Sequence, residues 1–494
     1  MTATIVPGQR ISGAIRAWPT IWQLGRYEAR MALRHPLTFF GAVASVTLAV
    51  VELWREEPVL NRASVTLAWT MLPMAAAFAL IAGGAVHRAR GRSDAQPPMI
   101  MPLGMEQRTS GLLLGISFAG AFATFVLQLA LLVWLFTRDD AASLVWNEIL
   151  VGLVYVMFAA ALGAAIARWI SHPSSSLISI LTLIGLMIAV PYRQGDWGQL
   201  IGPEWLLPMA WPQEIVPYEV AFRPAGLHLV YLGGLTLLVA ATAVLGRWAA
   251  GWTLLVLGGS LAVPTGVAQL GPIAETRQSS VIEQLVGDNA DLTCETQGQA
   301  TYCALAGYER WIPLWIESAE PILEAAPAGT TSGIEVRQYP TVNPLTASDP
   351  FEQLDQWWFD ALARDIRARP RVVAVGVVWA DYAAFPLAHT LARVIAGCGV
   401  QCDGEAQTFA FLWLAAHNPG IRSIVEGNIG GDTAPIADCM VAEAWRLSSG
   451  RTLMHANWDA VIDPTTSYEE AGALLGIEVP APVDEFGQTG DGCE

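Results

Sequence analysis

The chain has 494 residues, of which 53% are hydrophobic and only 14% are charged. Soluble proteins carry about 25% charged residues, so this composition points away from an ordinary soluble protein. All 27 basic residues are arginines, and 44 residues are acidic. Without lysine the chain cannot form a P-loop GxxxxGK[ST], a lysine Schiff base or an SxxK nucleophile site. Any ATP-driven process must therefore use an ATPase in another chain.

Charge and cysteine content divide the chain near residue 271. Residues 1–271 hold 16 arginines, 13 acidic residues and no cysteine, whereas residues 272–494 hold 11 arginines, 31 acidic residues and all six cysteines. An apolar, nearly neutral half followed by an acidic half indicates two different solvents. We therefore expect an α-helical polytopic membrane domain over 37–271, followed by a soluble domain over 272–480 and an acidic tail over 481–494.

The uncharged apolar segments are long enough for about seven membrane crossings, with six as the alternative count. The expected crossings lie near 37–54, 64–86, 109–137, 149–168, 173–192, 225–246 and 251–271. In this arrangement eleven arginines of the membrane half fall on the N-terminal side and five on the other. The positive-inside rule then places residues 1–36 in the cytoplasm, and seven crossings place the soluble domain outside the cell membrane.

Residues 18–35 have the pattern of an amphipathic helix lying on the cytoplasmic membrane face. Arg26, Arg30 and Arg34 share one stripe, and Trp22 suits the headgroup region. Two roles stay open for this helix: a simple topogenic anchor, or a mechanical element that transmits motion to the first crossing.

The cytoplasmic segment 87–108 contains alternating arginines and then a Pro-Pro break. A short helix after this break would present adaptable apolar side chains to a shallow groove of another protein. These side chains are Met99, Met101, Leu103 and Met105. The alternative interpretation is an ordinary positive-inside loop.

Small residues recur at every fourth position in the third crossing, from Gly111 through Gly115, and in the fourth crossing around Gly163. This spacing favours close helix packing. Acidic residues are absent from the interior of the expected crossings, since Glu52 and Glu148 fall at outer ends. That distribution argues against a proton- or sodium-coupled carrier.

Three stretches together resemble the membrane subunit of ABC-2 type exporters of high-GC Gram-positive bacteria. They are LGRYEARMALRHPLTFFG, MPLGMEQRTSGLLLG and RPAGLHLVYLGGL. The resemblance implies a six-helix core, an interfacial connecting helix at the N-terminus and a coupling helix over about Asp94–Arg108. It also implies a re-entrant outer gate over about Trp205–Pro217. The seventh crossing and the soluble domain depart from that core.

The resemblance also implies site residues and partners. Those assigned to ATPase coupling are Asp94, Met99, Met101, Leu103, Met105, Glu106 and Arg108, and those assigned to the outer gate are Trp205 and Trp211. The expected partners are an ABC ATPase that holds ATP and Mg, a second permease copy in a homodimer or heterodimer, and the lipid bilayer. We expect no cofactor or metal in this chain and no catalytic residue. The alternative function is a membrane sensor or anchoring protein with an extracytoplasmic domain that binds a ligand or partner.

The soluble half predicts a mainly helical domain with little sheet. One apolar helical face follows Trp311, and a second runs over 351–366 before Pro370. Residues 371–379, RVVAVGVVW, predict a buried strand. Further helices are expected over 386–397, 406–418 and 434–448. This half has 31 acidic residues against 11 arginines, and such a negative net charge disfavours nucleic acid as a partner.

An even number of cysteines in the half expected outside the cell predicts disulfides. Cys294 and Cys303 would close a hairpin-like loop, and the pairing of Cys398, Cys402 and Cys439 stays open. A zinc site that adds His389 or His417 to these three cysteines, or inert thiols, are the alternatives. This half has three histidines and no HExxH or GxSxG motif, so we expect a transport subunit rather than a hydrolase.

Overall fold

The computed structural model describes fifteen segments of the chain, which form two compact units. The first unit spans Met1–Gln213 and Tyr218–Ser280, and the second spans Glu214–Pro217 and Val281–Glu494. The described segments are 7–54, 59–95, 104–138, 144–172, 174–188, 206–207, 224–245, 249–269, 290–339, 368–369, 371–375, 384–398, 402–419, 435–447 and 449–479.

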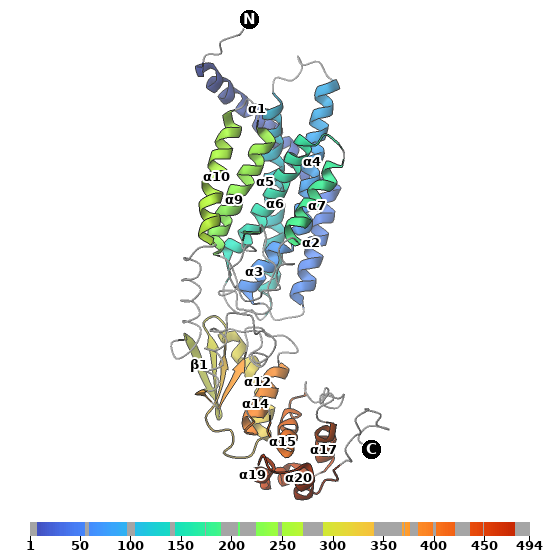
Figure 1. The fold of residues 1–494 in the computed structure, drawn as a ribbon, viewed down its shortest axis with the longest axis vertical. Helices are drawn as coiled ribbons and strands as arrows, with labels where there is room; N and C mark the ends of the chain where they lie inside the picture. Colours follow the sequence, from blue (N-terminus) through green and yellow to red (C-terminus); the bar gives the residue numbers. More distant parts are fainter. Residues whose placement is uncertain are drawn as a thin grey trace. The chain divides into compact units, whose positions relative to one another are not determined.

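The first unit is a bundle of helices (Figure 1). Its main helices are α1 (Pro7–Leu33), α2 (Pro36–Trp54), α3 (Leu60–Trp69), α4 (Leu72–Ala95), α5 (Met105–Leu135), α6 (Trp146–Trp169), α7 (Ser175–Ile188), α9 (Ala225–Val244) and α10 (Ala249–Gln269). Among the described residues, 6 spans are long and apolar enough to cross a membrane, with α3 and most of α4 forming one of them. The expected helical membrane architecture is confirmed at this level.

The difference between six and seven crossings lies in α7. Its 14 described residues rise about 21 Å at 1.5 Å per residue, which is less than the roughly 30 Å of a hydrocarbon core. By contrast, α9 and α10 are two separate helices of sufficient length. The seventh crossing therefore stays a prediction, and it depends on the segment that begins at Ser175.

Helix α6 packs against α4, α5 and α9 in the bundle. Where α6 meets α4, a side chain at Gly163 would collide with the backbone of Ala79. Ala159 and Ala167, one turn to either side of Gly163, are buried. The small-residue spacing seen in the sequence therefore does bring two helix backbones into close contact.

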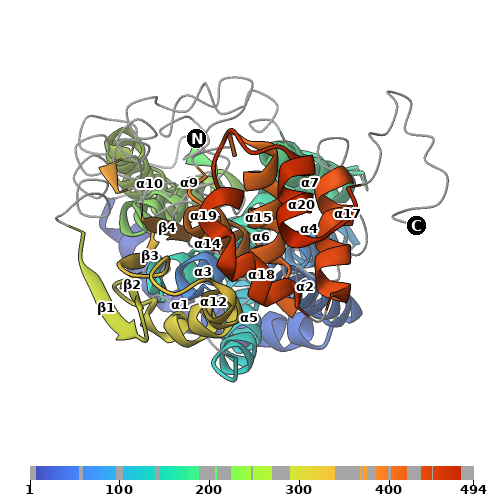
Figure 2. The same ribbon diagram turned by 90° about the horizontal axis from the view of Figure 1, so that it is seen from below.

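The second unit contains a four-stranded sheet in the order β1-β2-β3-β4. The strands are β1 (Leu292–Gln297), β2 (Ala300–Leu305), β3 (Ile334–Gln338) and β4 (Val372–Val375). Strand β1 is antiparallel to β2, while β2, β3 and β4 are parallel. Strand β1 forms the exposed edge of the sheet, as Figure 2 shows.

Helices pack beside this sheet and beside one another. They are α12 (Ile312–Ala325) after the short η4 (Glu309–Trp311), then α14 (Ala384–Ile395), α15 (Glu405–Ala415), α17 (Pro435–Arg446), α18 (Gly450–Ala456), α19 (Trp458–Val461) and α20 (Tyr468–Leu475). Trp311, Trp315 and Trp413 are fully buried among them. The apolar face predicted after Trp311 is the buried face of α12.

The sequence predicted a mainly helical second half with little sheet, and it did not indicate the extent of the sheet. Helix does outweigh strand in the described part of this unit, but the strands form a mixed sheet with a parallel centre. Strand β4 confirms part of the predicted run 371–379. Strand β3 was missed because its five residues, IEVRQ, mix charged and apolar side chains over a length too short for a period. The helix expected over 351–366 lies outside the described residues.

Candidate functional site

The expected interfacial helix is part of α1, which crosses the first half of α5 at very short range. A Cβ built on Gly25 would lie 3.1 Å from the carbonyl oxygen of Gly111, and one on Gly111 would lie 3.0 Å from that of Ile21. A side chain on Gly115 would collide with the backbone of Gly25. Only glycines allow this approach, so α1 packs directly on the small residues of α5.

The polar side of α1 faces away from that contact. Trp22, Arg26, Arg30 and Arg34 are all exposed, whereas Ile21 is buried. The predicted arginine stripe is therefore on a different side of the helix from Ile21, which lies at the contact with Gly111. This arrangement leaves the guanidinium groups of the three arginines accessible.

Helix α1 is joined to the first expected crossing, α2, by only Arg34 and His35. The hydroxyl of Thr38 donates to the carbonyl of Ala32 at 2.7 Å, which ties the first turn of α2 to the last turn of α1. The Nδ1 of His35 accepts the backbone N–H of Leu37 at 3.2 Å and satisfies one unpaired donor of α2. A displacement of α1 must therefore move the start of α2.

The residues assigned to coupling lie at the junction of α4 and α5. Met105, Glu106 and Arg108 are half-buried in the first turn of α5, where the N–H of Gly104 donates to the side chain of Gln107 at 3.2 Å. These three residues therefore belong to the long helix α5. Glu106 is well placed there because a carboxylate stabilises the positive end of the helix dipole.

The rest of the predicted coupling segment falls differently. Helix α4 extends to Ala95, so Asp94 lies on a helix rather than in a loop. Met99, Met101 and Leu103 lie outside the described residues. The predicted gate residues Trp205 and Trp211 also lie outside them.

Two contacts tie the same end of the bundle together. Arg90 Nη2 of α4 donates to the carbonyl of Arg168 at 2.6 Å, at the end of α6. His87 Nε2 lies 2.6 Å from the hydroxyl of Ser175, the first residue of α7. Arg90 thus links α4 to α6, a structural role that the sequence pattern did not indicate.

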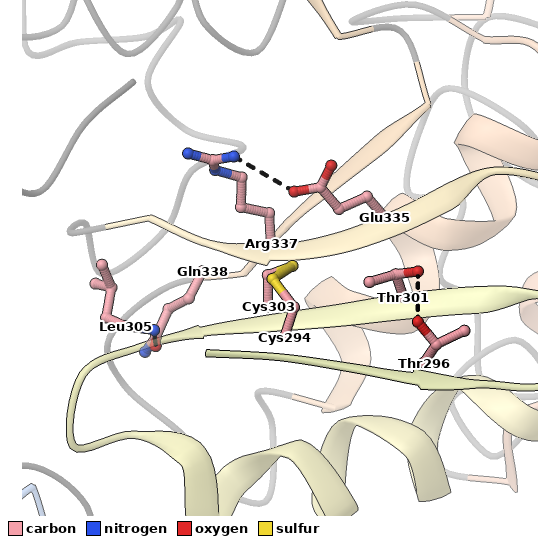
Figure 3. The surroundings of a disulfide bond; sticks show 8 residues. All are labelled: Cys294, Thr296, Thr301, Cys303, Leu305, Glu335, Arg337 and Gln338. Carbon is pink, nitrogen blue, oxygen red and sulfur yellow. Dashed lines mark hydrogen bonds and ion pairs between the residues drawn. A yellow bond between two sulfur atoms is a disulfide. The ribbon is translucent and has the colours of Figure 1, made fainter. Parts of the chain in front are cut away.

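In the second unit, the predicted disulfide between Cys294 and Cys303 is confirmed (Figure 3). The two cysteines are direct partners across the β1–β2 hairpin, with 4.1 Å between their Cα atoms. The hairpin loop has two residues and begins with Gly298, whose φ of 63° favours glycine. The turn therefore sets the register that pairs the cysteines.

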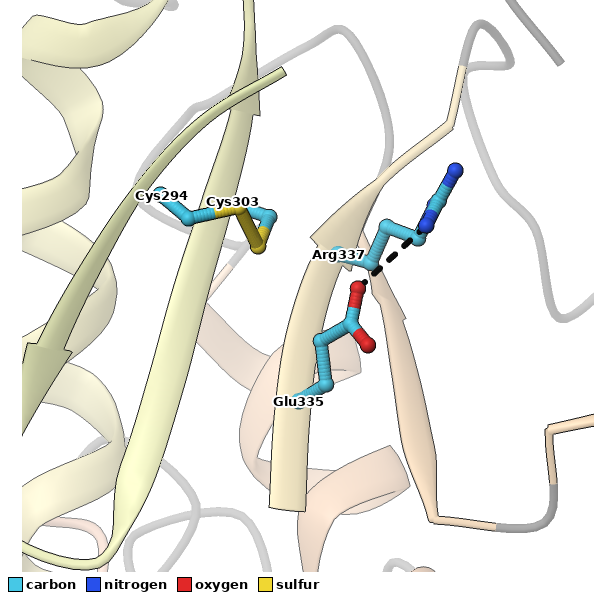
Figure 4. A network of polar contacts seen from close by, with 4 residues as sticks. All are labelled: Cys294, Cys303, Glu335 and Arg337. Atoms are coloured by element: carbon cyan, nitrogen blue, oxygen red, sulfur yellow. Dashed lines mark hydrogen bonds and ion pairs between the residues drawn. A yellow bond between two sulfur atoms is a disulfide. The ribbon is translucent and has the colours of Figure 1, made fainter. Parts of the chain in front are cut away.

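A buried arginine lies on the same sheet. Arg337 of β3 is only 6% exposed and pairs with Glu335 through an Nη1–Oε1 distance of 3.4 Å, as Figure 4 shows. Its guanidinium also lies 5.8 Å from the ring of Tyr339. The sequence did not indicate this pair, because charged residues two apart in a short segment usually belong to a solvated surface.

The open cysteine connectivity is settled in part. Cys398 and Cys402 form a disulfide, and Cys439 is disulfide-bonded as well. Cys493 lies outside the described residues. The three sulfur ligands of the zinc alternative are therefore all oxidised, and no group of three or more potential ligands for a metal ion occurs among the described residues. The zinc alternative would need these cysteines in the reduced state.

Two histidines of this unit lie in aromatic surroundings. His389 packs edge-on to Phe411 at 4.5 Å between ring centroids, and His417 packs in the same way against Trp413 at 4.6 Å. Burial lowers the pKa of each histidine to about 4, and Arg393 adds to the effect at His389. These neutral rings belong to the packed interior of the domain.

No family model, curated protein or solved structure matches this chain. The functional argument therefore depends on the residues and their geometry.

Proposed function

We propose that this chain is the membrane-spanning permease subunit of an ATP-driven exporter of the ABC-2 type. A separate ATPase subunit would bind and hydrolyse ATP with Mg and drive the efflux of a substrate. The permease would work as a homodimer or heterodimer in the bacterial cell membrane, with a cytoplasmic N-terminus and an extracytoplasmic second unit.

The observation that supports this proposal best is that α1, α2 and α5 are linked by direct contacts. Helix α1 packs on Gly111 and Gly115 of α5, and a hydrogen bond from Thr38 links it to α2. A partner that pushes on the start of α5 would therefore also move α1 and the expected first crossing. A chain that only anchors a domain in the membrane has no need for such a linkage.

The amino-acid composition also supports a separate ATPase subunit. The chain contains no lysine, so a P-loop ATPase site has to be in a partner. The exposed Arg26 and Arg30 offer charge-assisted contacts to an acidic partner surface or to anionic lipid headgroups.

In this proposal Met105, Glu106 and Arg108 contact the ATPase together with the segment that precedes them, Asp94 to Leu103. Glu106 and Arg108 would form charge pairs with the partner, and the methionines would fill a shallow apolar groove. The second unit would cover the exit path or hold a substrate or partner.

The double variant Glu106→Gln/Arg108→Gln tests this assignment. We expect the ATPase activity of the purified permease–ATPase complex to fall several-fold relative to the unmodified complex. The abundance of the permease in the membrane should stay unchanged. The matched control is Glu52→Gln, an exposed carboxylate at the opposite end of α2. Coupled activity equal to that of the unmodified complex would remove these residues from the ATPase contact.

The second candidate function is a sensor or anchoring protein, favoured by the size of the acidic second unit. In that case ligand binding to this unit would be signalled through the bundle without ATP hydrolysis. Purification in mild detergent distinguishes the two functions, because a sensor brings down no ATPase.

A further inference from the structure

Strand β1 is exposed along its length, unlike the strand beside it. Residues Thr293–Gln297 are all exposed, whereas β2 is buried apart from Thr301, which is half-buried. Since β1 is first in the order of the sheet, one of its edges has no neighbouring strand among the described residues. Natural sheets often protect such an edge with proline, lysine or a bulge, and β1 has none of these. The question is therefore what this edge binds.

The pairing with β2 determines which backbone groups of β1 point outward. In an antiparallel pair, hydrogen-bonded pairs with Cα atoms about 5.5 Å apart alternate with non-hydrogen-bonded pairs about 4.5 Å apart. The Cα atoms of Cys294 and Cys303 are 4.1 Å apart, so this pair is of the non-hydrogen-bonded kind. The N–H of Ala306 donates to the carbonyl of Asp291 at 3.3 Å, which agrees with the same alternation.

By this alternation, the N–H and C=O groups of Leu292, Cys294 and Thr296 point away from β2. No hydrogen bond joins these backbone groups to another residue in the part of the chain that the structure describes. The outer edge of β1 thus offers a donor and an acceptor at every second residue. An extended segment of about six residues could pair with all of them.

The hairpin that carries this edge is held in shape by its own contacts. The disulfide joins β1 to β2 at Cys294, and the hydroxyls of Thr296 and Thr301 lie 3.2 Å apart, as Figure 3 shows. The tight turn at Gly298 closes the hairpin. A strand that is already ordered loses little conformational entropy when a partner binds. Strand β1 is therefore suited to strand addition.

The charge around the edge determines what kind of segment fits. Glu295 of β1 is exposed, and the hydroxyl of Thr293 donates to Glu309 at 3.5 Å. Burial raises the pKa of Tyr302 to about 12, and the nearby carboxylate of Glu320 in α12 adds to this effect. Tyr302 is the direct cross-strand partner of Glu295. Three carboxylates therefore lie on one side of the hairpin.

A second copy of the chain is the other candidate for this edge. Pairing of two β1 strands would bring together two second units, and residues 272–494 hold 31 acidic residues against 11 arginines. Arg310, which follows Glu309, does not balance the three carboxylates of the hairpin side. Like charges that face each other across an interface cost free energy. A basic segment avoids this cost, so charge complementarity favours it over a second copy.

We propose that β1 is a docking edge for an extended, positively charged peptide segment, which adds to the sheet as a further strand. Its backbone pairs with Leu292, Cys294 and Thr296, and its basic side chains lie beside Glu295 and Glu309. Such a segment has arginine or lysine at every second position, because successive side chains of a strand point to opposite faces. The inference concerns the second unit alone and does not depend on the exporter assignment.

Titration of the purified full-length chain in neutral detergent with a synthetic peptide of alternating arginine and valine tests this edge. We expect saturable binding and slower hydrogen exchange at the amides of Leu292, Cys294 and Thr296. A peptide with glutamate in place of arginine should not bind. Thr296→Pro removes one outward N–H without touching the bonds to β2, so it should weaken binding about tenfold. The matched control, Thr296→Ala, keeps the N–H and should bind as the unmodified chain does.

Glu295→Gln provides a second variant in case Thr296→Pro does not fold, and it should weaken binding about two- to fivefold. Absence of saturable binding would overturn the proposal. Equal binding by the unmodified chain and a folded Thr296→Pro chain would also overturn it and indicate simple charge attraction. If the same amides became protected at high chain concentration without peptide, a second copy would be the occupant and the proposal would be wrong.

Discussion

Gly115 of α5 lies directly against the backbone of Gly25 of α1, with no space for a side chain on Gly115. Two helices whose contacting glycines are 90 positions apart in the sequence thus meet backbone to backbone. The contact leaves the arginine stripe of α1 exposed and makes the two helices one mechanical element.

Substitution of Gly115 tests this contact. Gly115→Val should displace α1 and lower the stability of the purified protein by about 1–3 kcal/mol, as overpacking does at tight contacts. The measurement is thermal unfolding in detergent. Gly233→Val on α9 is the control, because a Cβ at Gly233 has no neighbour within 4 Å. Equal losses in the two variants would contradict the close contact.

The disulfide between Cys294 and Cys303 should stabilise the second unit. Because it closes a short loop, we expect Cys294→Ser/Cys303→Ser to lower the stability of this unit by about 2–3 kcal/mol. Limited proteolysis of the full chain, with and without the double change, checks this expectation. Unchanged protease resistance would mean that the hairpin is held by other contacts.

The sequence predicted those parts of the fold that have a long, uniform signal. Long uncharged apolar segments predicted the membrane-length helices, which have 19–31 residues in the structure. The glycine spacing from Gly111 to Gly115 predicted a close helix contact. The sequence could not show that α1 is the partner in that contact. Two glycines on different helices carry no information about which helices meet.

The errors have a common physical cause, which is that burial depends on distant residues. Glu148 was expected at an interface because only charge position was visible, whereas α3 covers it in the structure. Strand β3 is specified by its neighbours β2 and β4 rather than by its own five residues. The pairing of Cys398 with Cys402 could not be chosen from the sequence, because Cys439 was an equally open partner.

The stability of the second unit should depend on pH. An unfolded histidine takes up a proton near pH 6.5, whereas His389 and His417 do so only near a pKa of about 4 in the folded unit. Between these values the unfolded state binds more protons, so stability is present above about pH 6.5 and falls as the pH decreases toward 4.

Unfolding of the full chain followed by tryptophan fluorescence at several pH values measures this dependence. His389→Gln and His417→Gln should each reduce its slope, because each removes one group that binds protons differently in the two states. The exposed His172, in the first unit, is the control and should leave the slope unchanged after His172→Gln. A slope that persists in the His389→Gln/His417→Gln double variant would contradict this explanation.

The number of crossings is testable by thiol labelling, since residues 1–271 contain no cysteine. After reduction of intact cells, a membrane-impermeant maleimide should label the second unit, as expected for an odd number of crossings. Labelling that requires permeabilised cells would place this unit in the cytoplasm. The count of crossings would then be even, and α7 would not span the membrane.

The central claim is that this chain moves in response to an ATPase that it does not contain. The most direct test is purification of the tagged full-length chain from its native host in mild detergent, with ATPase activity measured on the product. We predict a stoichiometric nucleotide-binding subunit and ATP hydrolysis. Folded protein with no ATPase subunit and no activity would contradict the exporter assignment and favour a sensor or anchor.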